Sequence, residues 1–221
     1  MAGRVFSGEA RLDKPGAMLA RDAPVDVRGR DHEWTSRGGI KLAHALDRFG
    51  LDARGRVALD LGASTGGFTD VLLRRGAARV YAVDVGYGQL DWGLRNDDRV
   101  VVLERTNARY LTAAAIPEAP GAITCDVSFI GLETALPAAL GLAVPGTWLV
   151  ALIKPQFEVG KGRVGRSGVV RERALRTEVC ARIHGWLSGQ PGWSVLGLDE
   201  SPITGPAGNV EFFIAATFRA A

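Results

Sequence analysis

The 221-residue chain has no long apolar run and no apolar segment at its start. No hydrophobic stretch approaches the roughly 18 residues that a membrane-spanning helix requires. The first residues, MAGRVFSGEARLD, lack the apolar core of a secretory signal peptide. The sequence therefore predicts a cytoplasmic protein without membrane association.

Cysteine and histidine are also scarce. The two cysteines, Cys125 and Cys180, fit no metal or redox spacing, so a pair of buried thiols is the simpler interpretation. The three histidines lie at unrelated positions, and we expect no metal site. The net charge of +3 permits a polyanionic partner without requiring one.

From residue 57 onward, short β-type runs alternate with helical patterns. Such alternation predicts a largely parallel sheet that helices cover on both faces. Only SPITGPAGN separates the last two strands, so these should pair antiparallel at one edge. The expected strands are 57–61, 79–84, 100–104, 122–127, 147–153, 194–198 and 210–218, and the expected helices are 67–75, 89–95, 132–140 and 171–187.

An amphipathic helix precedes this pattern, in GGIKLAHALDRFG. Its apolar residues recur at helical spacing, and we expect Ser36 to cap it and Gly50 to end it. Residues 1–30 differ from the rest because they are polar and rich in turn residues. They predict a small appendage to an α/β domain that covers residues 31–221.

The stretch LDLGASTGGFTD, residues 59–70, predicts a strand, a glycine turn and a helix, which together form a nucleotide-binding signature. A phosphate-binding P-loop needs a lysine after its last glycine, whereas Phe68 follows Gly67. A dinucleotide loop needs a glycine where Ser64 stands. The remaining candidate is S-adenosylmethionine, which needs close backbone approach but no lysine.

Two polar residues after the next strands support a bound nucleoside. Asp84 ends the second strand, where a carboxylate can accept hydrogen bonds from both ribose hydroxyls, although a helix cap is the alternative. Asn107 follows the third strand, where it can either contact an adenine edge or stabilise a turn. The predicted cofactor residues are Gly62, Ala63, Ser64, Thr65, Gly66, Gly67, Phe68, Asp84, Val85, Asn107 and Asp126.

The motif CDVSFIG follows the fourth strand, and its residues bear on which substrate atom would receive the methyl group. Enzymes of this fold that methylate exocyclic base nitrogens tend to carry a diproline after the acid, where this chain has Val127 and Ser128. Methylation of cytosine C5 needs a thiolate. Cys125 is adjacent to Asp126 in the strand and should point to the opposite side of the sheet.

Four ionisable residues lie at the ends of predicted elements. They are Lys41, Asp126, Lys154 and Glu211. A lysine at the end of the apolar run LVALIK is unusual, because burial of an ammonium group is costly unless it is paired. Each residue alone is equally consistent with a surface position or a salt bridge. Together they indicate an active site, because such sites lie at the carboxyl ends of strands in open α/β sheets.

The combined motifs SRGGIKL, LDLGASTGGFTD, VDVGYGQL, ERTNAR, CDVSFI, LIKPQFE, VVR and GNVEF resemble the TlyA family of ribosomal RNA 2′-O-methyltransferases, also called haemolysin-like. They are more distantly similar to the FtsJ/RrmJ methyltransferases. The resemblance covers residues 34 to about 218. It implies a Rossmann-like class I S-adenosylmethionine-dependent fold: a seven-stranded, mostly parallel sheet with an antiparallel last strand and helices on both faces. It also implies ribosomal RNA or ribosomal subunits as the partner and a cytidine 2′-hydroxyl as the acceptor.

In those families a Lys-Asp-Lys-Glu tetrad catalyses methyl transfer, and its motifs fall on the same four residues. The resemblance implies that Lys154 is the base for the 2′-hydroxyl or orients it, while Asp126 steers the lysine amine. Lys41 and Glu211 would position the ribose. No metal is implied.

The resemblance weakens before residue 31. TlyA proteins begin with an S4-type RNA-binding domain, and RVFSGEARLDKPGAMLARDAPVDV resembles only its second half. We therefore expect a partial S4-like segment over residues 1–30 and an FtsJ-like domain over residues 31–221. RNA binding should be weaker than in a protein with a complete S4 domain.

Three other functions remain as alternatives. A non-catalytic RNA-binding or ribosome-assembly factor would not need the tetrad. A haemolysin-like, membrane-active protein would need a span or a strongly amphipathic basic helix. An NAD-dependent oxidoreductase is disfavoured by Ser64 in the glycine turn.

Overall fold

The computed structural model describes residues 5–12, 16–27, 32–160, 162–165 and 168–219. The chain divides into two compact units, Met1–Glu33 and Trp34–Ala221. The predicted boundary between residues 30 and 31 lies outside the described residues. The first unit contains an antiparallel sheet of order β2-β1-β3, which the sequence pattern did not predict because each strand is too short to show alternation. These strands are β1 (Val5–Ser7), β2 (Ala10–Arg11) and β3 (Asp26–Val27).

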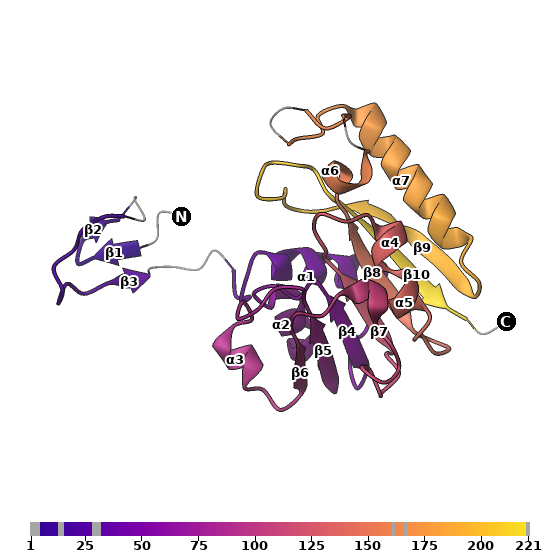
Figure 1. Cartoon of the computed structure of the whole chain (residues 1–221), viewed down its shortest axis with the longest axis horizontal. Helices are drawn as coiled ribbons and strands as arrows, with labels where there is room; N and C mark the ends of the chain where they lie inside the picture. Colours follow the sequence, from indigo (N-terminus) through magenta and orange to yellow (C-terminus); the bar gives the residue numbers. More distant parts are fainter. Residues whose placement is uncertain (1–4, 13–15, 28–31, 161, 166–167, 220–221) are drawn as a thin grey trace. The chain divides into compact units, whose positions relative to one another are not determined.

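The second unit is built on a seven-stranded sheet of order β6-β5-β4-β7-β8-β10-β9 (Figure 1). The first five strands in this order, β6-β5-β4-β7-β8, are parallel, and β10 runs antiparallel to both of its neighbours, β8 and β9. The predicted fold class is thus confirmed, including the antiparallel last strand. The strands are β4 (Val57–Leu61), β5 (Arg79–Val83), β6 (Val100–Leu103), β7 (Ala122–Cys125), β8 (Trp148–Ile153), β9 (Trp193–Glu200) and β10 (Phe212–Phe218).

Helices cover both faces of this sheet, and strand side chains alternate between two buried clusters. Leu59 and Leu61 of β4 face the cluster that includes α4, α5 and α7, whereas Ala58 faces the cluster of α1 and α2. The helices are α1 (Gly38–Phe49), α2 (Gly67–Arg74), α3 (Trp92–Arg95), η1 (Ala108–Tyr110), α4 (Leu132–Ala135), α5 (Pro137–Leu140), α6 (Pro155–Glu158) and α7 (Arg173–Ser188).

Two helical predictions need correction. The expected helix 132–140 is interrupted between α4 and α5, where Pro137 has no N–H to continue the first helix. The prediction of Ser36 as the cap of α1 is wrong: the N-cap is Arg37, which makes no side-chain cap hydrogen bond. At the other end, Gly50 adopts the left-handed conformation (φ 64°) and ends α1 as predicted.

Asp60 is an acidic residue in the middle of the sheet. Its side chain is fully buried, and its two oxygens accept hydrogen bonds from the Thr69 hydroxyl (2.7 Å) and the Thr124 hydroxyl (2.9 Å). Because burial disfavours the carboxylate form, the pKa of Asp60 is raised to about 6. The folded chain therefore holds this proton more tightly than the unfolded chain does.

We expect Asp60 to make stability depend on pH. The proton contributes stability that is fully present below the ordinary pKa of 3.8 and is lost as the pH rises through about 6. That shift corresponds to about 3 kcal/mol. In Asp60→Asn the two threonine hydroxyls can still form hydrogen bonds with the amide, and the side chain no longer titrates. Between pH 4 and pH 7, the free energy of unfolding in urea should therefore rise by about this amount in the variant relative to the wild type. A difference that does not change over this range would contradict the assignment.

Candidate active site

Two cavities lie at the carboxyl edge of the parallel strands. The larger, of about 630 Å³, is bordered by the turns after β4, β5, β6 and β7, and we term it the glycine-turn cavity. The smaller, of about 410 Å³, contains both lysines of the predicted tetrad, and we term it the lysine cavity. The cavities adjoin, since both are lined by Gly62, Ser64, Asp126 and Ser128.

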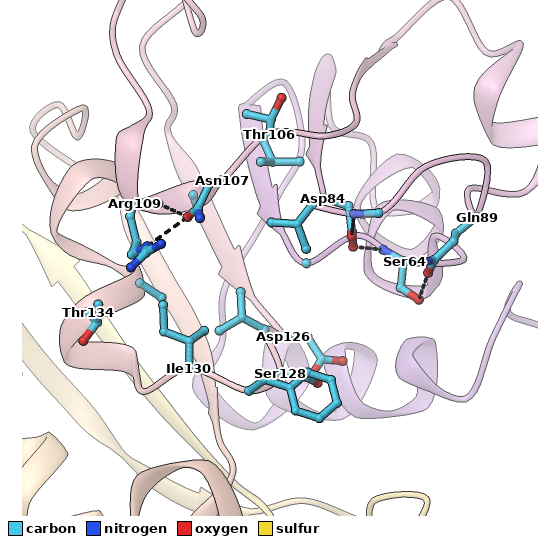
Figure 2. Close-up of a pocket in the computed structure, with 18 residues that line it drawn as sticks. Ser64, Asp84, Gln89, Thr106, Asn107, Arg109, Asp126, Ser128, Ile130 and Thr134 are labelled. Carbon is cyan, nitrogen blue, oxygen red and sulfur yellow. Dashed lines mark hydrogen bonds between the residues drawn. The ribbon is translucent and has the colours of Figure 1, made fainter.

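Asp84 lines the glycine-turn cavity. One carboxylate oxygen accepts a hydrogen bond from the Ser64 N–H (2.8 Å) and the other from the Gly86 N–H (2.7 Å) (Figure 2). Ser64 has a positive φ of 48°, and its hydroxyl lies 3.3 Å from Gln89 Oε1. The carboxylate thus fixes the glycine turn, and each oxygen retains capacity to accept a ligand hydroxyl.

Two glycines of the turn have different structural roles. Gly62 has a φ of 80°, and a Cβ there would lie 2.8 Å from the Asp126 carbonyl oxygen, so only glycine permits this close approach to the end of β7. Gly66 has a φ of 98°, and a Cβ there would lie 2.3 Å from Leu94 Cδ1. Gly66 therefore allows α3 to pack against the turn and borders neither cavity.

Asn107 has the turn role that was one of its two predicted roles. Its Oδ1 caps η1 by accepting hydrogen bonds from the Arg109 backbone N–H (3.1 Å) and from Arg109 Nε (3.2 Å). The residue also lines the glycine-turn cavity (Figure 2).

The lysine cavity contains two lysine–carboxylate ion pairs. Lys41 Nζ of α1 lies 2.5 Å from Glu211 Oε2, and both side chains are buried. Lys154 Nζ lies 2.7 Å from Asp126 Oδ1. The antiparallel pairing of β10 with β8, which sets Phe212 opposite Ile153, brings Glu211 to the same edge as Lys154. The structure thus brings together all four tetrad residues, from four separate segments.

The predicted cofactor residues other than Gly66 line one of the cavities or both. Six line the glycine-turn cavity: Gly62, Ser64, Asp84, Val85, Asn107 and Asp126. Ala63, Thr65, Gly67 and Phe68 line the lysine cavity. Sequence reasoning assigned no site role to several lining residues, although most lie within its quoted motifs: Ser36, Arg37, Gln89, Thr106, Arg109, Ser128, Ile130, Thr134, Thr204 and Pro206.

The alternative of cytosine C5 methylation, with Cys125 as the nucleophile, is disfavoured. Cys125 is fully buried in the cluster that contains α4, α5 and α7, and burial raises the pKa of its thiol to about 12. A thiol in this environment is not converted to a nucleophilic thiolate near neutral pH.

Two findings concern the described residues as a whole. Within them, no three His, Cys, Asp or Glu side chains are grouped as a metal ion would require. In the same part of the chain, no helix combines the length and apolarity needed to cross a membrane.

The order of the strands and the glycine turn after β4 are those of a Rossmann-like fold. The solved O-methyltransferase from Bacillus cereus, in complex with SAH, shares this fold with a TM-score of 0.54 at 18% identity, over 85% of this chain and 84% of that chain. The FtsJ-like methyltransferase family matches residues 34–218, so the chain belongs to this family. The predicted enzyme class is thereby confirmed.

Two relatives are much more similar. The 16S/23S rRNA (cytidine-2′-O)-methyltransferase TlyA of Mycobacterium tuberculosis is 49% identical over 216 residues, which is 95% of this chain and 80% of that protein. The solved structure of a haemolysin-like protein from Streptococcus thermophilus has a TM-score of 0.83 and 42% identity, over 99% of this chain and 80% of that chain. The predicted resemblance to TlyA and haemolysin-like proteins is confirmed.

Proposed function

We propose that this chain transfers a methyl group from S-adenosylmethionine to the 2′-hydroxyl of a ribosomal RNA nucleotide, with a cytidine as the acceptor. The observation that carries this proposal is the pair of lysine–carboxylate contacts in a cavity that adjoins the glycine turn. The 49% identity to TlyA, whose name specifies cytidine 2′-O-methylation of rRNA, supports the choice of substrate.

The glycine-turn cavity would hold the cofactor. Its volume of about 630 Å³ lies within the usual range of small-molecule sites. Asp84 would accept the ribose hydroxyls, Asn107 would contact the adenine edge, and Gly62 would allow close approach of the ligand to the backbone. The bound cofactor supplies the methyl group on its sulfonium sulfur.

The lysine cavity would hold the ribose to be methylated. Lys154 would remove or orient the 2′-hydroxyl proton, with Asp126 holding the lysine amine at 2.7 Å. Lys41 and Glu211 would fix the ribose, because methyl transfer requires oxygen, carbon and sulfur in line and positioning supplies much of the rate. Asp126 borders both cavities, so it can serve the donor and the acceptor together.

We also propose that the N-terminal unit contributes to RNA binding as a partial S4-like segment and that the methyltransferase domain starts near residue 31. Its described part has an antiparallel sheet and exposed apolar side chains at Met18 and Val25. Ribosomal subunits in the cytoplasm would be the binding partner.

The test is transfer of radiolabelled methyl groups to isolated ribosomal subunits, followed by nucleoside mapping. We expect 2′-O-methylcytidine as the labelled product. Label on a base carbon or nitrogen would overturn the assignment of the acceptor, and no label on either subunit would overturn the proposed substrate.

Cofactor choice leads to a separate prediction at Asp84. Calorimetry should detect binding of S-adenosylmethionine and not of NAD. Asp84→Ala should weaken that binding by roughly 1–3 kcal/mol, because two ribose hydroxyls lose their acceptor and the Ser64 turn loses its anchor. Asp98→Ala, on the exposed turn before β6, is the matched control and should bind normally. Equal affinity in the wild type and Asp84→Ala would exclude this carboxylate from the cofactor site.

A further inference from the structure

Ser128 and Ser64 are the two hydroxyl residues that line both cavities, and Ser128 is the one that contacts Lys154. It is exposed, it lines both cavities, and its Oγ accepts a hydrogen bond of 2.9 Å from Lys154 Nζ. Lys154 itself is buried. A hydroxyl that enters the lysine cavity can therefore reach Ser128 more easily than it can reach the lysine amine.

Three oxygens surround Lys154 Nζ, and they differ chemically. Besides Ser128 Oγ they are the Asp126 carbonyl oxygen at 3.3 Å and Asp126 Oδ1 at 2.7 Å. The Oδ1 contact has the distance of an ion pair but not the angles of a hydrogen bond, so the side-chain hydrogen bond of Nζ is the one to Ser128. Nζ therefore donates hydrogen bonds to two of these oxygens and forms an ion pair with the third.

A lysine that acts as a base must first be a neutral amine, with two N–H donors and one lone pair. Both Asp126 oxygens can only accept hydrogen bonds, whereas a serine hydroxyl can accept or donate. Ser128 is therefore the one of the three partners that can donate to the lone pair of the amine. By reversing its hydrogen bond, it can serve both protonation states of Lys154.

The backbone around Ser128 is held in place. Phe129 has a positive φ of 67°, and its ring packs against Phe157 of α6 with centroids 5.0 Å apart. The Leu132 N–H donates to Glu158 Oε1 (2.8 Å), which ties the start of α4 to α6. Because Lys154 immediately precedes α6, these contacts fix Ser128 relative to the lysine.

We propose that Ser128 is a further catalytic residue, which relays the ribose proton to Lys154; this inference rests on the proposed function. As the O–CH₃ bond forms and the S–CH₃ bond breaks, the 2′-hydroxyl proton passes to Ser128 Oγ and the serine proton passes to the neutral Nζ. The sulfonium becomes a neutral sulfide, the amine becomes an ammonium, and charge and atoms balance. The new ammonium then forms the ion pair with Asp126.

The test compares Ser128→Ala and Ser128→Thr with the wild type in single-turnover methylation of ribosomal subunits at saturating cofactor. Loss of the relay should slow Ser128→Ala at least about 10-fold, with cofactor affinity and subunit affinity within twofold of wild type, since general acid–base groups contribute this much or more. Ser128→Thr retains the hydroxyl and should recover most of the rate. Ser188→Ala, at the exposed end of α7, is the control for serine removal.

A second measurement needs no cofactor or RNA. In protein labelled with ¹⁵N at lysine Nζ, the ammonium protons of Lys154 should exchange faster with water in Ser128→Ala than in wild type, and Ser128→Thr should restore the slow exchange. An alanine variant with wild-type turnover, or a threonine variant as slow as alanine, would overturn the relay. An inactive wild type would instead overturn the proposed function, and the exchange measurement would still report whether Ser128 engages the amine.

Discussion

Lys154→Ala should lower the single-turnover rate of methyl transfer at least about 100-fold, because proton-transfer groups typically contribute 10²- to 10⁴-fold. Affinity for S-adenosylmethionine should be nearly unchanged, since Lys154 lines the lysine cavity and not the glycine-turn cavity. Calorimetry of the variant against wild type would separate the two effects. A loss of cofactor binding equal to the loss of rate would show that Lys154 acts by holding the cofactor site.

Lys154→Arg tests the nature of this role. Arginine stays protonated, so it can hold a charge near Asp126 but cannot accept a proton. We expect no recovery of activity in this variant. Wild-type turnover in Lys154→Arg would exclude Lys154 as the base. The lysine would then contribute only a positive charge that holds neighbouring groups in place. Cys125→Ala is the matched control, and it should retain most activity because its thiol is buried on the far side of the strand.

Periodicity predicts the strands and long helices of this chain because these elements bury regular faces. Every expected strand of the second unit is present, and Asp84 and Asp126 follow directly after β5 and β7. The pattern does not reveal α6 or η1, since elements of four or three residues show no helical period. It also misses the break before Pro137, because α4 and α5 present apolar residues to the same cluster.

The grouping of the four tetrad residues could be predicted because Asp126 and Lys154 follow strand ends, Glu211 precedes a strand and Lys41 lies in the first turns of α1. Ser128 could not be predicted, since its role comes from a 2.9 Å contact across the fold that no local pattern encodes. For the same reason, the Ser64 N–H was not expected to be the donor to Asp84. Sequence spacing thus locates charged groups at strand ends, while their hydrogen-bond partners depend on the turns between them.

The Lys41–Glu211 pair gives the largest expected effect on stability. The two side chains are 8% and 1% exposed, and their charged atoms are 2.5 Å apart. Removal of one partner leaves a buried charge without compensation, so Lys41→Met should lower the free energy of unfolding by about 3–5 kcal/mol in urea denaturation at pH 7. Arg75→Met, which breaks the exposed contact of Arg75 with Asp47, is the control and should cost at most about 1 kcal/mol.

The double variant Lys41→Met with Glu211→Gln separates stability from catalysis. It buries no net charge, so it should recover most of the lost unfolding free energy, because neutral replacement of both partners removes the desolvation penalty. Its methyl-transfer rate should stay as low as that of Lys41→Met, since neither replacement can position a ribose as a charged group does. If the double variant regained wild-type turnover together with its stability, the pair would be a folding element of the lysine cavity and only Asp126 and Lys154 would remain as candidates for the chemistry.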